Sequence, residues 1–158
     1  MSDVHRSIPH VVALLQHPSD GRVLTVRHQP HSWHSPGLLT VVGGRLEVDE
    51  FFDEGAAREF TEETGILIAP DRLEFCRLVH LHAAHGERVT GVVFLTRQWE
   101  GEPFNREPGT HSELVWADPA DPPGDCHPFT RELLRHFDAG LRYANVVAPE
   151  LSGGGECP

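Results

Sequence analysis

The sequence predicts an α/β protein of the α+β type, in which helices pack against a mixed β-sheet. Its 158 residues, 39% of them apolar and 23% charged, suit one globular domain with a core of its own. Short apolar runs bounded by glycine, proline and polar residues indicate strands. Two segments with helical composition interrupt these runs and give the element order β-β-β-α-β-β-β-α.

Three strands are expected first. Apolar runs at 8–15 and 22–27 flank the sequence His-Pro-Ser-Asp-Gly at 17–21, which favours a turn, so the two runs are predicted to form a β-hairpin. A loop rich in histidine, proline and serine follows at 28–36. The third strand is predicted at 38–42, directly before a pair of glycines.

The first helix is predicted at 51–64. This segment is rich in glutamate and alanine, and Gly65 follows it at the position where a left-handed residue commonly ends a helix. The glycine pair before it, Gly43 and Gly44, lets the backbone turn sharply or approach a ligand closely.

The C-terminal half repeats this alternation. Strands are predicted at 72–83 and 89–99 as a second pair, and a last strand at 112–117 follows a polar loop at 101–110. The second helix is predicted at 129–139, because its apolar residues recur on one face and a glycine follows.

The domain is expected to span residues 1–148, and residues 149–158 are expected to form a disordered tail. There is no internal repeat, linker or second domain in the pattern.

The charge balance excludes several function classes. A net charge of −11 argues against binding to a nucleic acid polymer or an anionic membrane. All 13 basic residues are arginine, so a Walker-type phosphate loop and a Schiff-base mechanism are excluded, since both need lysine. Three cysteines without a CxxC pair argue against a disulfide framework or a zinc site. The N-terminus is polar rather than signal-like, and we expect a cytoplasmic location.

Acidic residues concentrate around the first helix. Glu59, Glu62 and Glu63 fall at i, i+3 and i+4, so their carboxylates share one side of a helix. Such like charges repel one another by a few tenths of a kcal/mol per pair, and a hard divalent cation reverses the sign of that effect. An alternative interpretation is a solvated surface helix with a glycine cap.

The stretch 44–66 resembles the Nudix box, G-x5-E-x7-R-E-U-x-E-E-x-G-U, where U is apolar. Both U positions are apolar, and chance agreement at all the fixed positions is negligible. The fixed positions are occupied by Gly44, Glu50, Arg58, Glu59, Glu62, Glu63 and Gly65.

The resemblance implies a Nudix-type α/β/α sandwich with a loop–helix–loop catalytic motif. It also implies that Glu59, Glu62 and Glu63 bind Mg²⁺, for which Mn²⁺ can substitute. By the same match Arg58 orients a ligand carboxylate and Glu50 supports the metal site.

An acid outside the box often completes the metal site of this family or acts as the base. Glu107 is the candidate here and Glu113 is the second choice; the alternative for Glu107 is a solvated loop charge. Homodimers are frequent in the family, although no residue in the sequence demonstrates one.

The chain is similar to small MutT-like members of the family. The resemblance implies hydrolysis of a (deoxy)nucleoside triphosphate, either unmodified or oxidised or otherwise modified, to the monophosphate and pyrophosphate. One alternative is a nucleoside diphosphate linked to another moiety, such as ADP-ribose or a nucleotide sugar. An alternative of another class is a catalytically silent module that senses a nucleotide.

Candidate substrate-binding residues lie on both sides of the box. Gly43 and Gly44 are expected to approach the phosphates. Trp33 is a candidate for stacking on a base, and an exposed loop aromatic is the alternative. Phe104 and Asn105 are the remaining candidates for reading a base. In the segment 37–44 this chain departs from the family pattern G-x-W-x-x-P-G-G at Leu39 and Val42.

Overall fold

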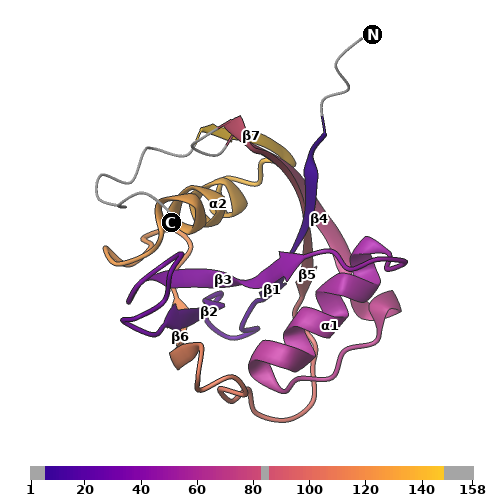
Figure 1. Cartoon of the computed structure of the whole chain (residues 1–158). Coiled ribbons are helices and arrows are strands. Elements are labelled where there is room, and N and C mark those ends of the chain that lie inside the picture. Colours follow the sequence, from indigo (N-terminus) through magenta and orange to yellow (C-terminus); the bar gives the residue numbers. More distant parts are fainter. Residues whose placement is uncertain (1–5, 83–85, 148–158) are drawn as a thin grey trace, which may run out of the picture.

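The computed structural model describes residues 6–82 and 86–147, and within them seven strands form one mixed sheet (Figure 1). The strand order across the sheet is β6-β2-β3-β1-β5-β4-β7. In chain order the strands are β1 (Ile8–Leu15), β2 (Val23–His28), β3 (Leu39–Arg45), β4 (Glu74–His82), β5 (Arg88–Thr96), β6 (His111–Ala117) and β7 (Tyr143–Val147). The helices are α1 (Phe52–Thr64), the 3₁₀ turn η1 (Pro70–Arg72) and α2 (Pro128–Asp138).

Strand β1 lies at the centre of the sheet because both of its faces are apolar. Val11, Val12, Ala13, Leu14 and Leu15 are all buried. Alternate residues point to opposite faces, so Val12 and Leu14 join the core cluster that contains residues of α2. Val11, Ala13 and Leu15 join the cluster that contains residues of α1.

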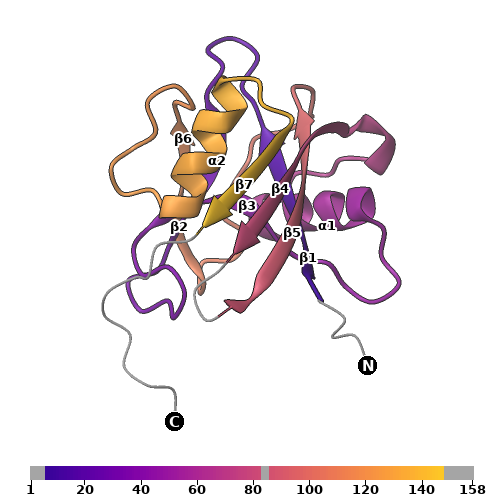
Figure 2. The same cartoon turned by 90° about the horizontal axis from the view of Figure 1, so that it is seen from above.

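The two helices cover opposite faces of the sheet, as the view from above shows (Figure 2). Phe60 of α1 anchors one core, and Leu133 and Leu134 of α2 anchor the other; all three are fully buried. The fold class expected from the sequence, an α/β/α sandwich with a mixed sheet, is therefore confirmed. Neither described helix combines the length and the apolar composition that crossing a membrane requires.

The predicted hairpin of 8–15 with 22–27 is wrong. Strand β1 pairs antiparallel with β3 and parallel with β5, and β2 pairs with β3 and β6. At their turn the two segments are joined by an isolated bridge, Gln16 to Val23, and by a hydrogen bond from the backbone N–H of His17 to the carbonyl of Arg22 at 2.8 Å. A strand that is buried on both faces needs a partner along each edge, and the connection after Leu15 is long enough to let β3 enter between β1 and β2.

Strand β7 and the turn η1 are absent from the predicted element order. Strand β7 is short and lies at the edge of the sheet, parallel to β4, with only Ala144 and Val146 buried. Such a brief alternation gives little signal in a sequence. The second strand pair is confirmed as an antiparallel pairing of β4 with β5. The expected tail at 149–158 lies outside the described residues.

Candidate active site

Helix α1 is fixed at both ends by groups outside its own hydrogen-bond ladder. At its start the carboxylate of Glu54 accepts a hydrogen bond from the backbone N–H of Phe51 at 2.9 Å, which satisfies a donor that the helix leaves free. At its end Gly65 adopts a left-handed φ of 71°. A side chain at Gly65 would also collide with the ring of Phe104, so this position requires glycine for two reasons.

One face of α1 packs on the sheet and leaves the acidic face free. Ala56 and Phe60 are fully buried against β1, β2 and β3. Gly55 allows the helix to approach the preceding loop, since a β-carbon there would lie 2.9 Å from both the Glu50 carboxylate and Leu46. The loop before the helix is therefore held against it, as the loop–helix–loop motif requires.

Arg58 lies at the centre of the acidic residues. Its Nε and Nη2 donate to the two carboxylate oxygens of Glu50 at 2.8 and 3.1 Å, which is a forked pair. Its Nη1 donates to Glu59 at 2.9 Å and to Glu62 at 3.1 Å, and Nη2 also donates to the carbonyl of Arg45 at 3.1 Å. The hydrogen bond from Arg58 holds the pKa of Glu50 below its usual range. Glu50 thus fixes Arg58, and Arg58 positions two of the glutamates.

Glu59 and Glu63 are buried acids, and burial destabilises the charged form of each. Burial raises the pKa of Glu59. Burial, and then the nearby charge of Glu59, raises the pKa of Glu63 well above its ordinary value. The Glu63 Oε1 atom accepts a hydrogen bond from the backbone N–H of Gly43 at 3.5 Å, whereas its Oε2 atom is buried without a partner among the described residues. A buried anionic oxygen without a donor is suited to a cation.

The glycine pair is needed because β3 passes directly beside these carboxylates. A β-carbon on Gly44 would overlap the Glu59 carboxylate, and one on Gly43 would overlap the carbonyl of Val11 on the neighbouring strand. Gly43 also has a positive φ of 152°. Gly44 therefore lies against Glu59, and Gly43 lies against Val11 and donates its N–H to Glu63; that the two glycines face the phosphates stays a prediction.

Glu107 approaches the site because its loop docks on the C-terminal end of α1. The backbone N–H groups of Phe104 and Arg106 donate to the carbonyls of Thr64 at 3.0 Å and Glu63 at 3.2 Å, two of the carbonyls that a helix end leaves unpaired. Burial, and then the charge of Glu62, raises the pKa of Glu107. Glu113, the second choice, instead forms an ion pair with Arg27 at 2.6 Å.

The acidic side chains fit a divalent cation, although they do not form a finished cluster. In the described part of the chain no three histidine, cysteine or acidic side chains converge as a ready metal site. Arg58 occupies oxygens of Glu59 and Glu62, and the Oε2 atom of Glu63 is buried without a hydrogen-bond partner among the described residues. Oxygen donors of this kind are the ligands that Mg²⁺ takes. Glu59, Glu62, Glu63 and Glu107 are thus the residues that could hold it.

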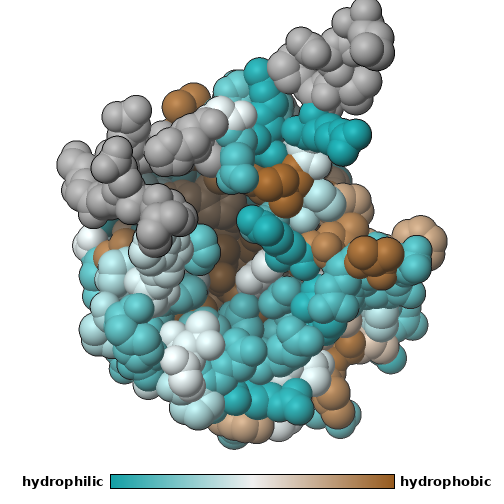
Figure 3. Space-filling view, viewed as in Figure 1, coloured by the Kyte–Doolittle hydropathy of each residue, from teal (hydrophilic) through white to brown (hydrophobic). Residues whose placement is uncertain are grey.

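The candidate base-reading residues differ in how much of each side chain is free to contact a ligand. Trp33 is 75% exposed and Phe104 is 56% exposed, so both offer apolar surface to a ligand. The Asn105 amide is engaged within its own loop, because Nδ2 donates to the carbonyl of His111 at 2.8 Å and Oδ1 accepts from the N–H of Glu107 at 3.1 Å. The direct effect of Asn105 is to position Glu107. Figure 3 shows apolar residues in a recess near the centre of the viewed face, surrounded by mainly hydrophilic surface.

Sequence reasoning missed His111, which lies beside Glu107. Its ring is buried, its Nδ1 has no hydrogen-bond partner among the described residues, and that atom is 3.7 Å from Glu107 Oε2. Burial, and then His28, lowers the pKa of His111 to about 4. The rings of His28 and His111 lie edge to face with their centres 4.9 Å apart, because β2 and β6 pair these two positions. No local spacing could have joined two histidines so distant in sequence.

Comparisons with known proteins agree with the fold and with the resemblance found in the sequence. A model of the NUDIX domain matches residues 7–137. The 8-oxo-dGTP diphosphatase of Escherichia coli (strain K12) is 29% identical over 104 residues, which span 65% of this chain and 78% of that protein. The crystal structure of a MutT NUDIX hydrolase from Burkholderia pseudomallei has a TM-score of 0.70 at 27% identity and covers 83% of this chain and 98% of that one. A MutT protein from Methanosarcina mazei Go1 shares the fold, with a TM-score of 0.71 at 24% identity over 87% of this chain and 97% of that one.

Proposed function

Since this chain belongs to the Nudix family as a MutT-like pyrophosphohydrolase, we propose that its substrate is a (deoxy)nucleoside triphosphate, unmodified or oxidised. The products are the nucleoside monophosphate and pyrophosphate, and the cofactor is Mg²⁺, with Mn²⁺ as a substitute. The proposal rests on the buried pair Glu59 and Glu63, in which the Oε2 atom of Glu63 has no hydrogen-bond partner among the described residues. The pair lies next to Arg58, which holds Glu59 and Glu62.

The protein's own charge explains why a cation is needed. The chain carries a net charge of −11, and a triphosphate is also strongly anionic, so the two repel each other. When bound, Mg²⁺ neutralises phosphate charge and lowers the pKa of a coordinated water. Glu59, Glu62 and Glu63 hold the cation, while Arg58 keeps Glu59 and Glu62 in fixed rotamers through the fork that Glu50 anchors.

Glu107 is the proposed general base. Its carboxylate is half-exposed, so a water molecule can reach it, and its pKa is raised by burial and by the charge of Glu62. A raised carboxyl pKa brings the group closer to neutral pH and makes it a better proton acceptor. Asn105 and the docking of the loop on α1 set its position.

The substrate class is supported by the relative from Escherichia coli, whose name is 8-oxo-dGTP diphosphatase. We propose Trp33 and Phe104 as aromatic surfaces for the base, since both are exposed. The catalytically silent alternative is disfavoured because every fixed residue of the box is present, from Gly44 to Gly65.

The test is a hydrolysis panel with Mg²⁺, covering nucleoside triphosphates, 8-oxo-dGTP, ADP-ribose and nucleotide sugars in ¹⁸O-labelled water. The proposal expects release of pyrophosphate from a triphosphate, with the label in one of the two products. Glu62→Gln should abolish turnover, whereas Asp53→Asn, an acid on the same helix outside the constellation, should not. Turnover confined to ADP-ribose or a nucleotide sugar would favour the diphosphate alternative, and no turnover at all would favour the silent module.

A further inference from the structure

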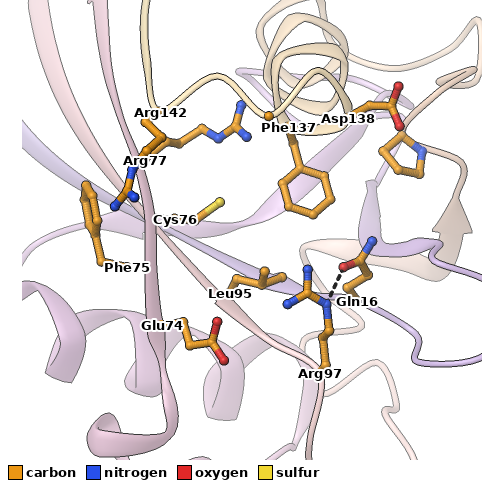
Figure 4. A pocket seen from close by; sticks show the side chains of 12 residues that line it. Gln16, Glu74, Phe75, Cys76, Arg77, Leu95, Arg97, Phe137, Asp138 and Arg142 are labelled. Atoms are coloured by element: carbon orange, nitrogen blue, oxygen red, sulfur yellow. Dashed lines mark hydrogen bonds between the residues drawn. The ribbon is translucent and has the colours of Figure 1, made fainter.

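A cavity of about 460 Å³ lies on the part of the sheet where β4 begins and β5 ends, next to the C-terminal end of α2 (Figure 4). None of its lining residues belongs to the acidic constellation around α1. Its walls combine three arginines with two aromatic rings: Arg77, Arg97, Arg142, Phe75 and Phe137. Three of the 13 arginines therefore line one cavity, although the chain has a net charge of −11.

Arg77 is the residue that makes this cavity exceptional. Its side chain is 98% buried, with 2% of its surface exposed. Two of its guanidinium nitrogens, Nε and Nη1, are buried without a hydrogen-bond partner among the described residues. Its guanidinium carbon lies over the ring of Phe137, 5.4 Å from the ring centre. Arginine remains charged in proteins, and a buried charge without a counterion is unfavourable. The part of the chain that the structure describes supplies no anion to this side chain.

A β-bulge places Arg77 in the cavity. The pairing of β4 with β5 shifts register between Phe75 and Arg77, with Cys76 as the additional residue. Phe75 then packs edge to face on Phe94, while Arg77 turns to the face that α2 covers. An irregularity in the strand therefore directs a cation into an apolar layer.

Arg97 and Arg142 bring two further cations to the same cavity. Both are exposed, and Arg97 uses only one N–H in a hydrogen bond to the Gln16 side chain at 2.8 Å. In Figure 4 the ring of Phe137 lies between Arg77 and Arg97. Glu74 and Asp138 also line the cavity, so three positive groups face two negative ones and leave a surplus of one positive charge.

We propose that this cavity binds a small ligand through an oxyanion group, a phosphate or a carboxylate, at a site separate from the active site. The forked guanidinium groups of the exposed Arg97 and Arg142 match the oxygens of either anion, and the oxyanion brings a negative charge beside the buried Arg77. The ring of Phe137 and the side chain of Leu95 offer apolar surface to the body of the ligand. A surplus of one positive charge suits a group with one or two negative charges.

Binding is measured by calorimetry and by thermal unfolding, with inorganic phosphate and with benzoate as separate probes. Ionic strength is held constant with NaCl, and a chelator removes divalent cations so that the acidic site cannot take up phosphate through a metal. We expect saturable binding of at least one probe, accompanied by a rise in the unfolding temperature. Saturation by benzoate alone identifies a carboxylate ligand, and saturation by phosphate alone identifies a phosphate ligand.

Three variants test the assignment. Arg97→Gln and Arg142→Gln should each weaken the affinity about tenfold, because each removes a charge-assisted contact from an exposed side chain. Arg77→Met should remove the response to the anion while the protein stays folded, since methionine fills the same space without a charge. Arg72→Gln, an exposed arginine on η1 outside the cavity, is the matched control and should bind like the wild type.

Equal affinity in the wild type and in Arg97→Gln and Arg142→Gln would overturn the proposal, as would the absence of saturable binding by both probes. An anion response in Arg77→Met that matches the wild type would do the same. Hydrolytic rates of Arg97→Gln are measured in parallel and should equal the wild-type rates, because the cavity shares no residue with the active site.

Discussion

Replacement of Arg58 by lysine tests the organisation of the acidic residues. The arginine donates five hydrogen bonds, two to Glu50 and one each to Glu59, Glu62 and the carbonyl of Arg45. Lysine keeps the charge but has three donors on a single nitrogen, so at least two of these bonds are lost. At about 1–2 kcal/mol for each partly solvated charge-assisted bond, Arg58→Lys should lower the free energy of unfolding by about 2–4 kcal/mol.

Urea unfolding at pH 7 measures this loss, with Arg72→Lys as the control at an exposed arginine without such contacts. The effect has a defined pH dependence. Because the hydrogen bond from Arg58 depresses the pKa of Glu50 in the folded state, the stabilisation is present above the ordinary glutamate pKa, about 4. It is lost as the pH falls through the lower folded value. A loss under about 0.5 kcal/mol at pH 7 would refute the role of Arg58 as the organising residue.

The remaining predictions concern the acids, the glycine pair and the buried histidine. Glu63→Gln should raise the free energy of unfolding of the metal-free protein by about 1 kcal/mol or more, because it removes a buried charge that a cation otherwise compensates. The same change should reduce turnover by orders of magnitude. Urea unfolding with a chelator measures the first effect, and a rate assay measures the second. Because the folded pKa of Glu63 is raised, its contribution to stability is present at low pH and is lost as the pH rises through that value. Added Mg²⁺ should therefore stabilise the wild type more at pH 8 than at pH 5, and it should stabilise Glu63→Gln less than the wild type. An equal effect of Mg²⁺ on the unfolding temperatures of both proteins contradicts this. Gly44→Ala should reduce kcat by about tenfold or more because its methyl group displaces the Glu59 carboxylate, whereas Gly124→Ala, where a methyl group meets open space, should have wild-type kinetics. The His111 ring, with a pKa of about 4, should remain neutral throughout an NMR titration from pH 8 to pH 5; protonation near pH 6.5 would contradict its burial.

The sequence was sufficient for the parts of the structure that depend on local patterns. Helix α1 and the glycine that ends it follow from composition and spacing within one segment. The predicted helix, 51–64, begins one residue before the observed helix. The three glutamates of the box also share one side because a helix has a fixed period.

The misjudged features depend on contacts between distant segments. The hairpin of 8–15 with 22–27 fits the local sequence pattern. In the structure β3 lies between these two strands, so that the central strand β1 has a hydrogen-bonded neighbour along each edge, β3 and β5. The pairing of β2 with β6, which brings His28 to His111, leaves no trace in local spacing. The bulge that directs Arg77 into an arginine-lined cavity is likewise a property of the strand pairing.

We propose that Glu59, Glu62 and Glu63 bind divalent cations against the pyrophosphate bridge of the substrate. A crystal structure with Mn²⁺ and a non-hydrolysable nucleoside triphosphate tests it most directly, because manganese can be located by its anomalous scattering. We predict manganese bound to these three carboxylates and to phosphate oxygens of the nucleotide. Manganese located elsewhere, or phosphates bound away from the three carboxylates, would contradict the account.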